Sequence, residues 1–416
     1  MTNQPESDVV GVGVGVVGWR CAVCATTLPI AAVHPFRCPR ATASDPHHVL
    51  HPVGTATIAA PFEHPNPFVR YGPRLAWWGF ARSRGMSVDA CVALTEDVAA
   101  GFTVTPFAPA PALSGALGAD VWAKDETANV GGSHKGRHLV TILLHLRAVE
   151  ALGLAPYGTN RPPLAIASCG NAAIAAATLA AGVVWPLRVF VPEWADQTVV
   201  SILDGLGAEI TRCARRTDDP PGDPAVLRFR EAVAAGALPF GVQGPENALC
   251  LDGGRTLGWE LADAPVPPRR VVVQVGGGAL AACVGWGLGE AVRLDTVQTA
   301  GCAPLARAWR RAEGLSDDRL GARWSELMTP WADPHSAADG ILDDETYDWI
   351  ADVEVMRRSG GRPIVVGEAH VLDAHRAAAT TGIPVSVTGS AGLAGLLAER
   401  PAPDERVAVV FSGVTR

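Results

Sequence analysis

The sequence contains only two lysines, Lys124 and Lys135, among 34 basic side chains, and the other 32 are arginines. Arginine stays protonated at neutral pH, whereas a lysine amine can lose its proton and form an imine with a carbonyl group. Lys135 lies in the motif GSHKGR, residues 132–137, at the predicted start of a helix, where the helix dipole disfavours the ammonium form. We therefore expect Lys135 to form a Schiff base, with a solvated surface lysine as the alternative. Lys124 is expected to be structural.

A second motif joins a predicted apolar strand, 164–167, to an alanine-rich helix that runs to residue 181. It consists of Ser168, Cys169, Gly170 and Asn171. Asn171 is expected at the N-terminus of the helix, where its side chain can cap the helix. The free backbone amides there, together with Ser168, predict a cradle for a substrate carboxylate, and a plain helix cap is the alternative.

A run of glycines follows a valine-rich segment, 270–275, that predicts a buried strand. The loop comprises Gly276, Gly277, Gly278, Ala279 and Leu280. Glycines let the backbone approach a phosphate, and the helix expected after the loop points its amides at it. The loop also matches the dinucleotide fingerprint, which needs an acidic residue at the end of the next strand. Asp295 precedes that strand, predicted at 296–299, so a single phosphate is favoured over a dinucleotide.

Two hydroxyl side chains, Thr388 and Ser390, flank Gly389 late in the sequence. A strand is predicted at 384–388 and a helix from residue 391. A hydroxyl at the end of a strand can hydrogen-bond a ring atom of a ligand. Thr388 is the preferred candidate, because it directly precedes the glycine.

The first 60 residues contain a separate set of side chains that could bind a metal. Cys21 and Cys24 form a C-x₂-C pair, and Cys38 follows. A zinc ribbon usually ends in a second such pair, but Ala41 stands where the last cysteine is expected. His48, or less favourably His47, is the candidate fourth ligand. The alternative is a degenerate ribbon that has lost its metal.

The composition excludes several classes of protein. Apolar residues make up 48% and charged residues 18%, which excludes a coiled coil and a disordered chain. The net charge of −8, without a long basic run, argues against a nucleic-acid partner, and no apolar run is long enough to span a membrane. The nine cysteines are an odd number scattered along the chain, which favours reduced thiols and a cytoplasmic protein.

From about residue 100 the sequence alternates predicted strands and helices. This alternation indicates an α/β fold with parallel sheets covered on both faces, and the length favours two such sheets. Ligands of open α/β sheets bind beyond the carboxyl ends of the strands. We therefore expect the loops at 168–171, 276–280 and 388–390 to gather around one site.

The order of these motifs resembles that of the fold-type-II pyridoxal-phosphate enzymes, which include threonine synthase, serine/threonine dehydratase and the tryptophan synthase β chain. The resemblance covers about residues 100–400. It implies that Lys135 is the Schiff-base lysine and that residues 276–280 hold the cofactor phosphate. It also implies that Asn171 bonds the phenolic oxygen and that Thr388 or Ser390 faces the pyridine nitrogen. Residues 168–171 would bind the substrate carboxylate.

The resemblance further implies two doubly wound α/β domains. The large one is expected to comprise residues 61–141 and 236–416, the small one 142–235, and residues 1–60 an N-terminal extension. The function it predicts is β- or γ-elimination or replacement on a hydroxy- or phospho-hydroxy amino acid, as in threonine synthase or, alternatively, a serine/threonine dehydratase. Pyridoxal 5′-phosphate, a structural zinc ion and a homodimer are expected. An NAD-dependent oxidoreductase and a zinc-ribbon binding module with an inactive α/β domain are the other hypotheses.

Overall fold

The structure is a computed structural model that describes residues 15–55, 59–220 and 222–416. The first fourteen residues of the expected extension lie outside this part of the chain. Three sheets organise the described residues, with six, four and three strands. None of the helices within these ranges is long and apolar enough to cross a bilayer.

The largest sheet has the strand order β12-β11-β10-β13-β5-β4. All neighbouring strands are parallel except the edge pair of β4 and β5, which is antiparallel. The parallel arrangement agrees with the predicted fold class. The strands are β4 (Phe107–Pro109), β5 (Asp120–Asp125), β10 (Arg270–Gln274), β11 (Arg293–Thr299), β12 (Pro363–Val366) and β13 (Arg406–Phe411).

Side chains of the central strands alternate between two hydrophobic cores, one on each face of this sheet. Val271 and Val273 of β10 belong to one core, whereas Val272 between them belongs to the other. A strand buried on both faces therefore reads as a continuous valine run, which is why the segment 270–275 predicted β10. The α/β class with covered parallel sheets is confirmed.

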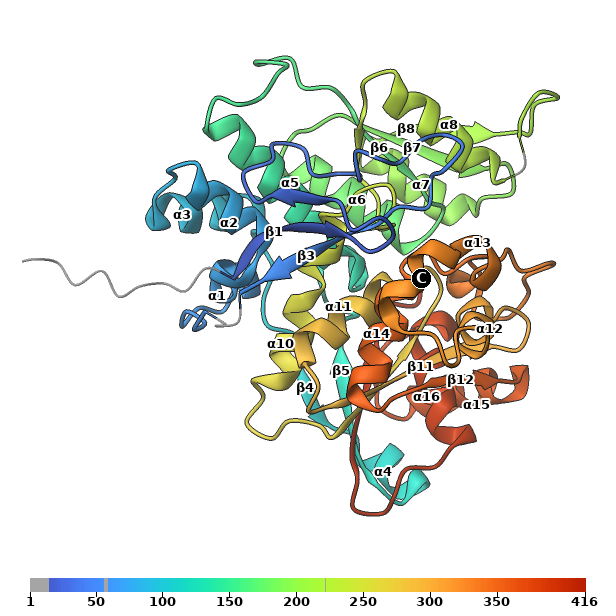
Figure 1. Cartoon of the computed structure of the whole chain (residues 1–416). Helices are drawn as coiled ribbons and strands as arrows, with labels where there is room; N and C mark the ends of the chain where they lie inside the picture. Colours follow the sequence, from blue (N-terminus) through green and yellow to red (C-terminus); the bar gives the residue numbers. More distant parts are fainter. Residues whose placement is uncertain (1–14, 56–58, 221) are drawn as a thin grey trace, which may run out of the picture.

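The smaller sheet has the order β8-β7-β6-β9, and all its pairs are parallel. Figure 1 shows it in the green part of the chain, above the large sheet, whose strands are drawn in cyan (β4 and β5) and in yellow to red. Its strands are β6 (Leu164–Ala167), β7 (Leu187–Pro192), β8 (Glu209–Cys213) and β9 (Leu238–Pro239). Since β9 lies beyond residue 235, this sheet reaches past the boundary expected for the small domain. The domain division itself stays a prediction.

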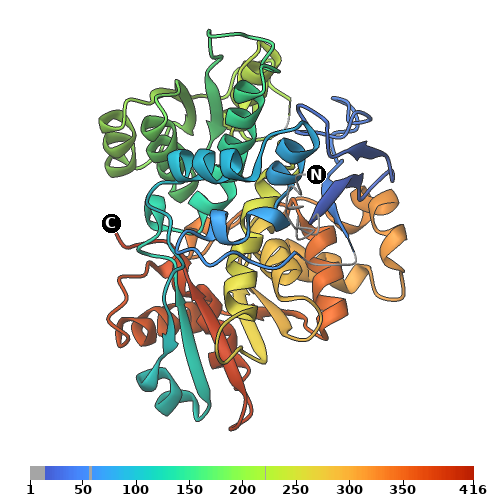
Figure 2. The same cartoon turned by 90° about the vertical axis from the view of Figure 1, so that its left-hand side faces the viewer.

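The third sheet is antiparallel, with the order β2-β1-β3. Its strands are β1 (Val16–Cys21), β2 (Thr27–Pro29) and β3 (Leu50–Gly54). In Figures 1 and 2 it lies at the level where the green part meets the yellow-to-red part. The N-terminal extension is thus a small sheet packed on the core.

Sixteen α-helices in the described residues cover and connect these sheets. They are α1 (Pro67–Arg70), α2 (Ala76–Ser83), α3 (Val88–Val98), α4 (Pro111–Leu117), α5 (Lys135–Ala151), α6 (Asn171–Gly182), α7 (Gln197–Gly205), α8 (Pro224–Ala234), α9 (Cys250–Gly253), α10 (Arg255–Ala262), α11 (Ala279–Leu288), α12 (Pro304–Arg311), α13 (Trp324–Leu327), α14 (Trp349–Ser359), α15 (Glu368–Ala379) and α16 (Val387–Ala398). Helix α5 runs across residue 141, where the large domain was expected to end.

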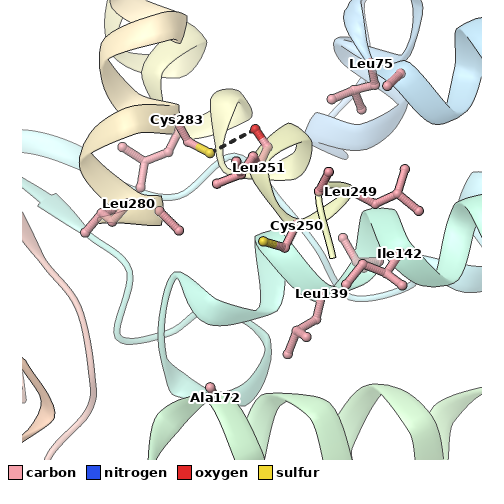
Figure 3. Close-up of a cluster of buried hydrophobic side chains, with 14 of the residues drawn as sticks. Leu75, Leu139, Ile142, Ala172, Leu249, Cys250, Leu251, Leu280 and Cys283 are labelled. Atoms are coloured by element: carbon pink, nitrogen blue, oxygen red, sulfur yellow. Dashed lines mark hydrogen bonds between the residues drawn. The ribbon is translucent and has the colours of Figure 1, made fainter. Parts of the chain in front are cut away.

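Helix α5 is the element that carries Lys135, and it is buried on nearly all sides. Figure 3 shows its Leu139 and Ile142 within a cluster that also contains Leu280 of α11 and residues around α9. The thiol of Cys283 in this cluster donates to the carbonyl of Leu251 at 3.0 Å. Close packing of this kind leaves the helix no freedom to shift along its axis.

A buried network of charges fixes the first turn of α5. The Arg137 guanidinium pairs with Glu126 at 2.7 Å and with Glu260 at 2.6 Å. Lys124 pairs with the same Glu260 at 2.5 Å and donates to the carbonyl of Thr105 at 2.6 Å. Burial alone would raise the pKa of Glu126, but the adjacent Arg137 lowers it. Two cations and two anions balance, so Lys124 has the structural role expected of it.

Replacing Arg137 by methionine is expected to destabilise the protein by about 3–5 kcal/mol, because it leaves two buried carboxylates with one cation. The free energy of unfolding in urea measures the loss. A matched control is Arg323→Met, which removes a guanidinium paired with Glu326 at 2.6 Å on the surface. The control should cost less than about 1 kcal/mol. Equal losses in the two variants would contradict a special role for the buried network.

Candidate active site

Lys135 is the first residue of α5 and is partly buried. The turn before it is shaped by glycine: Gly131 has a φ of 75°, and a side chain there would press on the backbone of Ala175 in α6. A side chain on Gly136 would lie 2.6 Å from the carbonyl oxygen of Val130. The motif therefore places the lysine where two helices start close together.

The environment of Lys135 favours its neutral amine. Burial lowers the pKa of Lys135, and the carboxylate of Asp343 opposes this shift by stabilising the ammonium form. A lysine amine with a lowered pKa is the nucleophile that Schiff-base formation requires.

The glycine loop links β10 to α11, and its backbone is buried except at Gly277, which is partly buried. Gly278 is the residue before α11 and has a φ of 99°, a conformation that favours glycine. The amide of Gly277 donates a hydrogen bond to the carboxylate of Asp343. An oxyanion thus already binds to this loop, as the predicted phosphate would.

An acidic segment that the sequence analysis did not identify lies against the glycine loop. It runs over residues 339–348, and its Asp348 amide donates to the carbonyl of Gly277 at 2.9 Å. Burial raises the pKa of Asp343 to about 6 and that of Asp348 to about 8. The signal was present as three adjacent acids, residues 343–345, in a chain with few charges, but such a run usually indicates a solvated loop.

The motif at 168–171 connects β6 to α6 as expected. Gly170 occupies the position before the helix, so Asn171 is its first residue, and the prediction that Asn171 caps the helix is wrong. Its side-chain oxygen instead accepts from Arg416 at 2.5 Å. The hydroxyl of Ser168 accepts from the amide of Gly170 at 3.4 Å. Cys169 lies between them, partly buried, and burial raises its pKa.

The predicted strand at 384–388 is wrong, because α16 begins at Val387. The Ser386 hydroxyl accepts from the amide of Gly389 at 3.1 Å and so caps the helix. Thr388 therefore lies in the first turn of a helix, donating to Asp339 at 3.0 Å. Ser390 is buried and donates to the carbonyl of Ser386 at 3.0 Å.

Ser412 is a site residue that the sequence analysis missed. It follows β13 directly, precedes Gly413 and is 3% exposed. Its hydroxyl accepts from the backbone amide of His134 at 3.0 Å and lies 2.5 Å from Nδ1 of the same histidine. The signal was a hydroxyl at the end of a valine strand, which is the argument that led to Thr388.

These contacts bring the motifs to one place. The amide of Val414 donates to the carbonyl of Gly132 at 2.9 Å, and Gly413 lies beside the Asn171 side chain. The starts of α5 and α6 and the end of β13 therefore meet. The glycine loop is linked to this point by Asp343, whose carboxylate accepts from the Gly277 amide and interacts electrostatically with Lys135.

Asp295, the candidate acidic partner of a dinucleotide, has a different role. It lies inside β11 and pairs with Arg270 at 2.6 Å and with Arg293 at 3.1 Å. Its carboxylate is buried in this pairing and is not at the carboxyl end of the strand. This arrangement argues against a dinucleotide.

The four candidate metal ligands also meet, away from Lys135. One donor atom from each of Cys21, Cys24, Cys38 and His48 lies within 4.8 Å of all the others.

Comparison with known proteins identifies the family of this chain. A family model described as "Pyridoxal-phosphate dependent enzyme" matches residues 98–413. The serine dehydratase-like protein of Rattus norvegicus is 32% identical over 188 residues, or 45% of this chain and 52% of that protein. The chain thus spans about half the length of the curated relatives it matches.

Solved structures show the same fold. The T.th. threonine deaminase has a TM-score of 0.60 at 23% identity, covering 79% of this chain and 98% of that one. A fungal L-serine ammonia-lyase from Rhizomucor miehei has a TM-score of 0.60 at 20% identity, covering 75% and 94%. The family match extends over the lysine turn, the glycine loop and the Ser-x-Gly-Asn motif, and the chain belongs to the pyridoxal-phosphate dependent enzyme family.

Proposed function

We propose that this chain is a pyridoxal-phosphate-dependent lyase that expels a hydroxyl or phosphate group from a hydroxy- or phospho-hydroxy amino acid. The observation that carries the proposal is Lys135, whose pKa is lowered by burial, at the meeting point of two helix starts and the end of β13. A neutral amine in that position can bind the cofactor and later take the α-proton of a substrate at Nζ.

The residues at this point fit the cofactor. The amide of Gly277 in the glycine loop already donates to the Asp343 carboxylate, and a phosphate would take the place of that group. Asn171 and Ser412 offer uncharged polar groups for the ring substituents. Bound there, pyridoxal phosphate supplies an electron sink for the bond to the α-carbon.

Neutral partners for the ring support elimination over transamination. Ser412 and Thr388 are both hydroxyls, and a hydroxyl cannot stabilise a protonated pyridine nitrogen as a carboxylate does. Of the two, Ser412 is the better placed, since its hydroxyl contacts His134, the neighbour of Lys135, whereas the Thr388 hydroxyl bonds Asp339 and the amide of Gly340. We propose Ser412 as the partner, in place of the sequence-based preference for Thr388.

Release of ammonia and a keto acid is the favoured outcome, and water addition to give threonine is the second. The favoured outcome is supported by the names of the similar proteins, a serine dehydratase-like protein, a threonine deaminase and an L-serine ammonia-lyase.

The test is to mix the purified protein with serine, threonine and O-phosphohomoserine and follow its absorption spectrum and products. Ammonia with a keto acid supports a lyase. A protein without a yellow chromophore, or one that accumulates the pyridoxamine form, would overturn the proposal.

Reduction with borohydride is expected to attach the pyridoxyl group to Lys135. Lys124 should stay unlabelled, because its amine is held by Glu260 in the core. Peptide mapping of the reduced protein identifies the labelled residue, and a label on Lys124 would refute the assignment.

The pH dependence of cofactor attachment is expected to follow the lowered pKa of Lys135. The rate of yellow-colour formation in apoprotein should rise with pH as the ammonium loses its proton, and level off below the ordinary lysine pKa of 10.5. Asp343→Asn removes a carboxylate that stabilises the ammonium, so the midpoint should move to lower pH. The exposed Asp204→Asn serves as the control and should leave it unchanged. An upward shift for Asp343→Asn would contradict the contact.

Gly277→Val is expected to weaken cofactor retention by at least about tenfold. The added Cβ would lie 3.0 Å from the Tyr347 ring, and the rest of the valine side chain would crowd the phosphate. Retention is measured as the rate of absorbance loss in the presence of a scavenger. Gly205→Val, at a position with open space around it, is the control. Unchanged retention in Gly277→Val would mean that another loop binds the phosphate.

Ser412→Ala is expected to lower kcat/KM about tenfold, roughly 1.4 kcal/mol, and to shift the absorption of the bound cofactor. Thr388→Ala should change kcat/KM by less than about twofold and leave the absorption of the bound cofactor unchanged, since the Thr388 hydroxyl bonds to Asp339. A larger effect in Thr388→Ala than in Ser412→Ala would make Thr388 the partner of the pyridine nitrogen.

A further inference from the structure

We propose that Cys21, Cys24, Cys38 and His48 bind one Zn²⁺ ion, which holds the N-terminal sheet against the wall of the cofactor site. Three of the four side chains are buried, and Cys24 is partly buried. They come from the end of β1, the turn after it, and two positions in the long loop before β3. A single ion would therefore cross-link segments that share little regular structure.

The distances between the donor atoms match a tetrahedral zinc site. Zinc bonds of ordinary length place two sulfurs about 3.8 Å apart, and a sulfur and a nitrogen about 3.5 Å apart. The sulfurs of Cys24 and Cys38 are 3.6 Å apart, and Cys21 Sγ lies 3.4 Å from His48 Nδ1. The sulfur–sulfur distance is far too long for a disulfide. Three thiolates and an imidazole are the donor set that zinc prefers.

Backbone amides are directed at the sulfurs of two of the cysteines. The amides of Val23 and Cys24 donate to the sulfur of Cys21, and the amide of Arg40 donates to that of Cys38. Each of these cysteines is followed by a tight turn, in which Ala25 and Ala41 donate to the carbonyls of Cys21 and Cys38 at 3.0 Å. Amides directed at sulfur stabilise the negative charge that metal binding requires.

The histidine is oriented by a carboxylate. Nδ1 of His48 faces the cysteines, and Nε2 lies 3.2 Å from the carboxylate of Asp45. A metal-bound histidine almost always donates its other ring N–H in this way, which fixes the tautomer and the plane of the ring. With four protein ligands no coordination position is left for a substrate, so the ion is structural.

The site connects the extension to residues beside the cofactor. His47, next to the ligand His48, stacks on Trp324 and lies 3.9 Å from the carboxylate of Glu345, in the acidic segment at 339–348. Val49 packs against Gly244, whose amide donates to Asp348 at 3.4 Å. Fixing the loop at 38–50 therefore also fixes the segment that bonds to the glycine loop and whose carboxylates interact electrostatically with Lys135.

The extension is anchored on the core at other points as well. The carbonyl of Phe36 accepts from the amide of Ala248 at 2.8 Å, and that of Val33 accepts from His145 of α5 at 2.7 Å. Loss of the ion should therefore loosen the wall of the site without unfolding the whole chain.

The test is the zinc content of the full-length holoenzyme, purified under reducing conditions without chelator. About one zinc per chain is expected in the wild type and much less in Cys38→Ser. The control Cys213→Ser changes the same residue type at the end of β8, outside the cluster, and should keep the ion. Cobalt in place of zinc should give the red-region absorption of a tetrahedral thiolate site, away from the cofactor band. A wild type with neither zinc nor cobalt uptake would overturn the site, as would full zinc content in Cys38→Ser.

Asp45→Ala tests the site even if a cysteine variant fails to fold, because the Asp45 side chain is 66% exposed and its loss should not disturb the core. It is expected to weaken zinc affinity about 10- to 100-fold in competition with a chromophoric chelator. Asp204→Ala should leave the affinity unchanged. Equal affinities in the two variants would contradict the orienting role of Asp45.

Zinc removal should lower the thermal unfolding midpoint and speed cofactor loss several-fold. An unchanged midpoint and an unchanged rate would overturn the link to the cofactor site. Zinc content and unfolding are measured without turnover, so these results test the zinc site independently of the proposed lyase reaction.

Discussion

Arg137 has its guanidinium in a part of the core that is closed to solvent, where it is bonded to two carboxylates, Glu126 just after β5 and Glu260 in α10. A buried cation of this kind is tolerated only while both anions stay in place, so the ends of these elements cannot move independently. Lys135 is two residues earlier in the same helical turn. The position of the proposed Schiff-base lysine therefore depends on a buried ion-pair network, and the second lysine of the chain, Lys124, completes that network.

Close backbone approach is the other constraint on the site. Gly131 lies against α6, Gly136 lies against the turn before α5, and Gly276 lies against the segment that contains Asp343. Each contact leaves no room for a Cβ, so helix starts and strand ends approach to backbone distance. The backbone amides at these approaches, together with a lysine of lowered pKa, are polar groups that suit the proposed anionic aldehyde cofactor.

The parts of the fold that the sequence revealed are those with one dominant local signal. A valine run identified β10, and the glycine loop and the lysine turn were found from residue type alone. The strand expected at 384–388 failed because the Ser386 side chain caps a helix there, and this local bond outweighs the β-preference of the flanking valines. Ser412 was missed because its role depends on His134, 278 residues away in sequence. The acidic segment was missed because its burial depends entirely on tertiary contacts.

The order of strands in the large sheet has a consequence for folding. Strand β13 lies between β10 and β5, although β5 precedes it by more than half of the chain. Until β13 is in place, two interior strands present unpaired edges, and pairing distant segments requires the closure of very long loops. The sheet is therefore completed late, by a central strand rather than by an edge strand. During synthesis, the edge of β5 stays open from residue 125 and that of β10 from residue 274, both until β13 is made, which makes the interval before β13 is made the stage most exposed to aggregation.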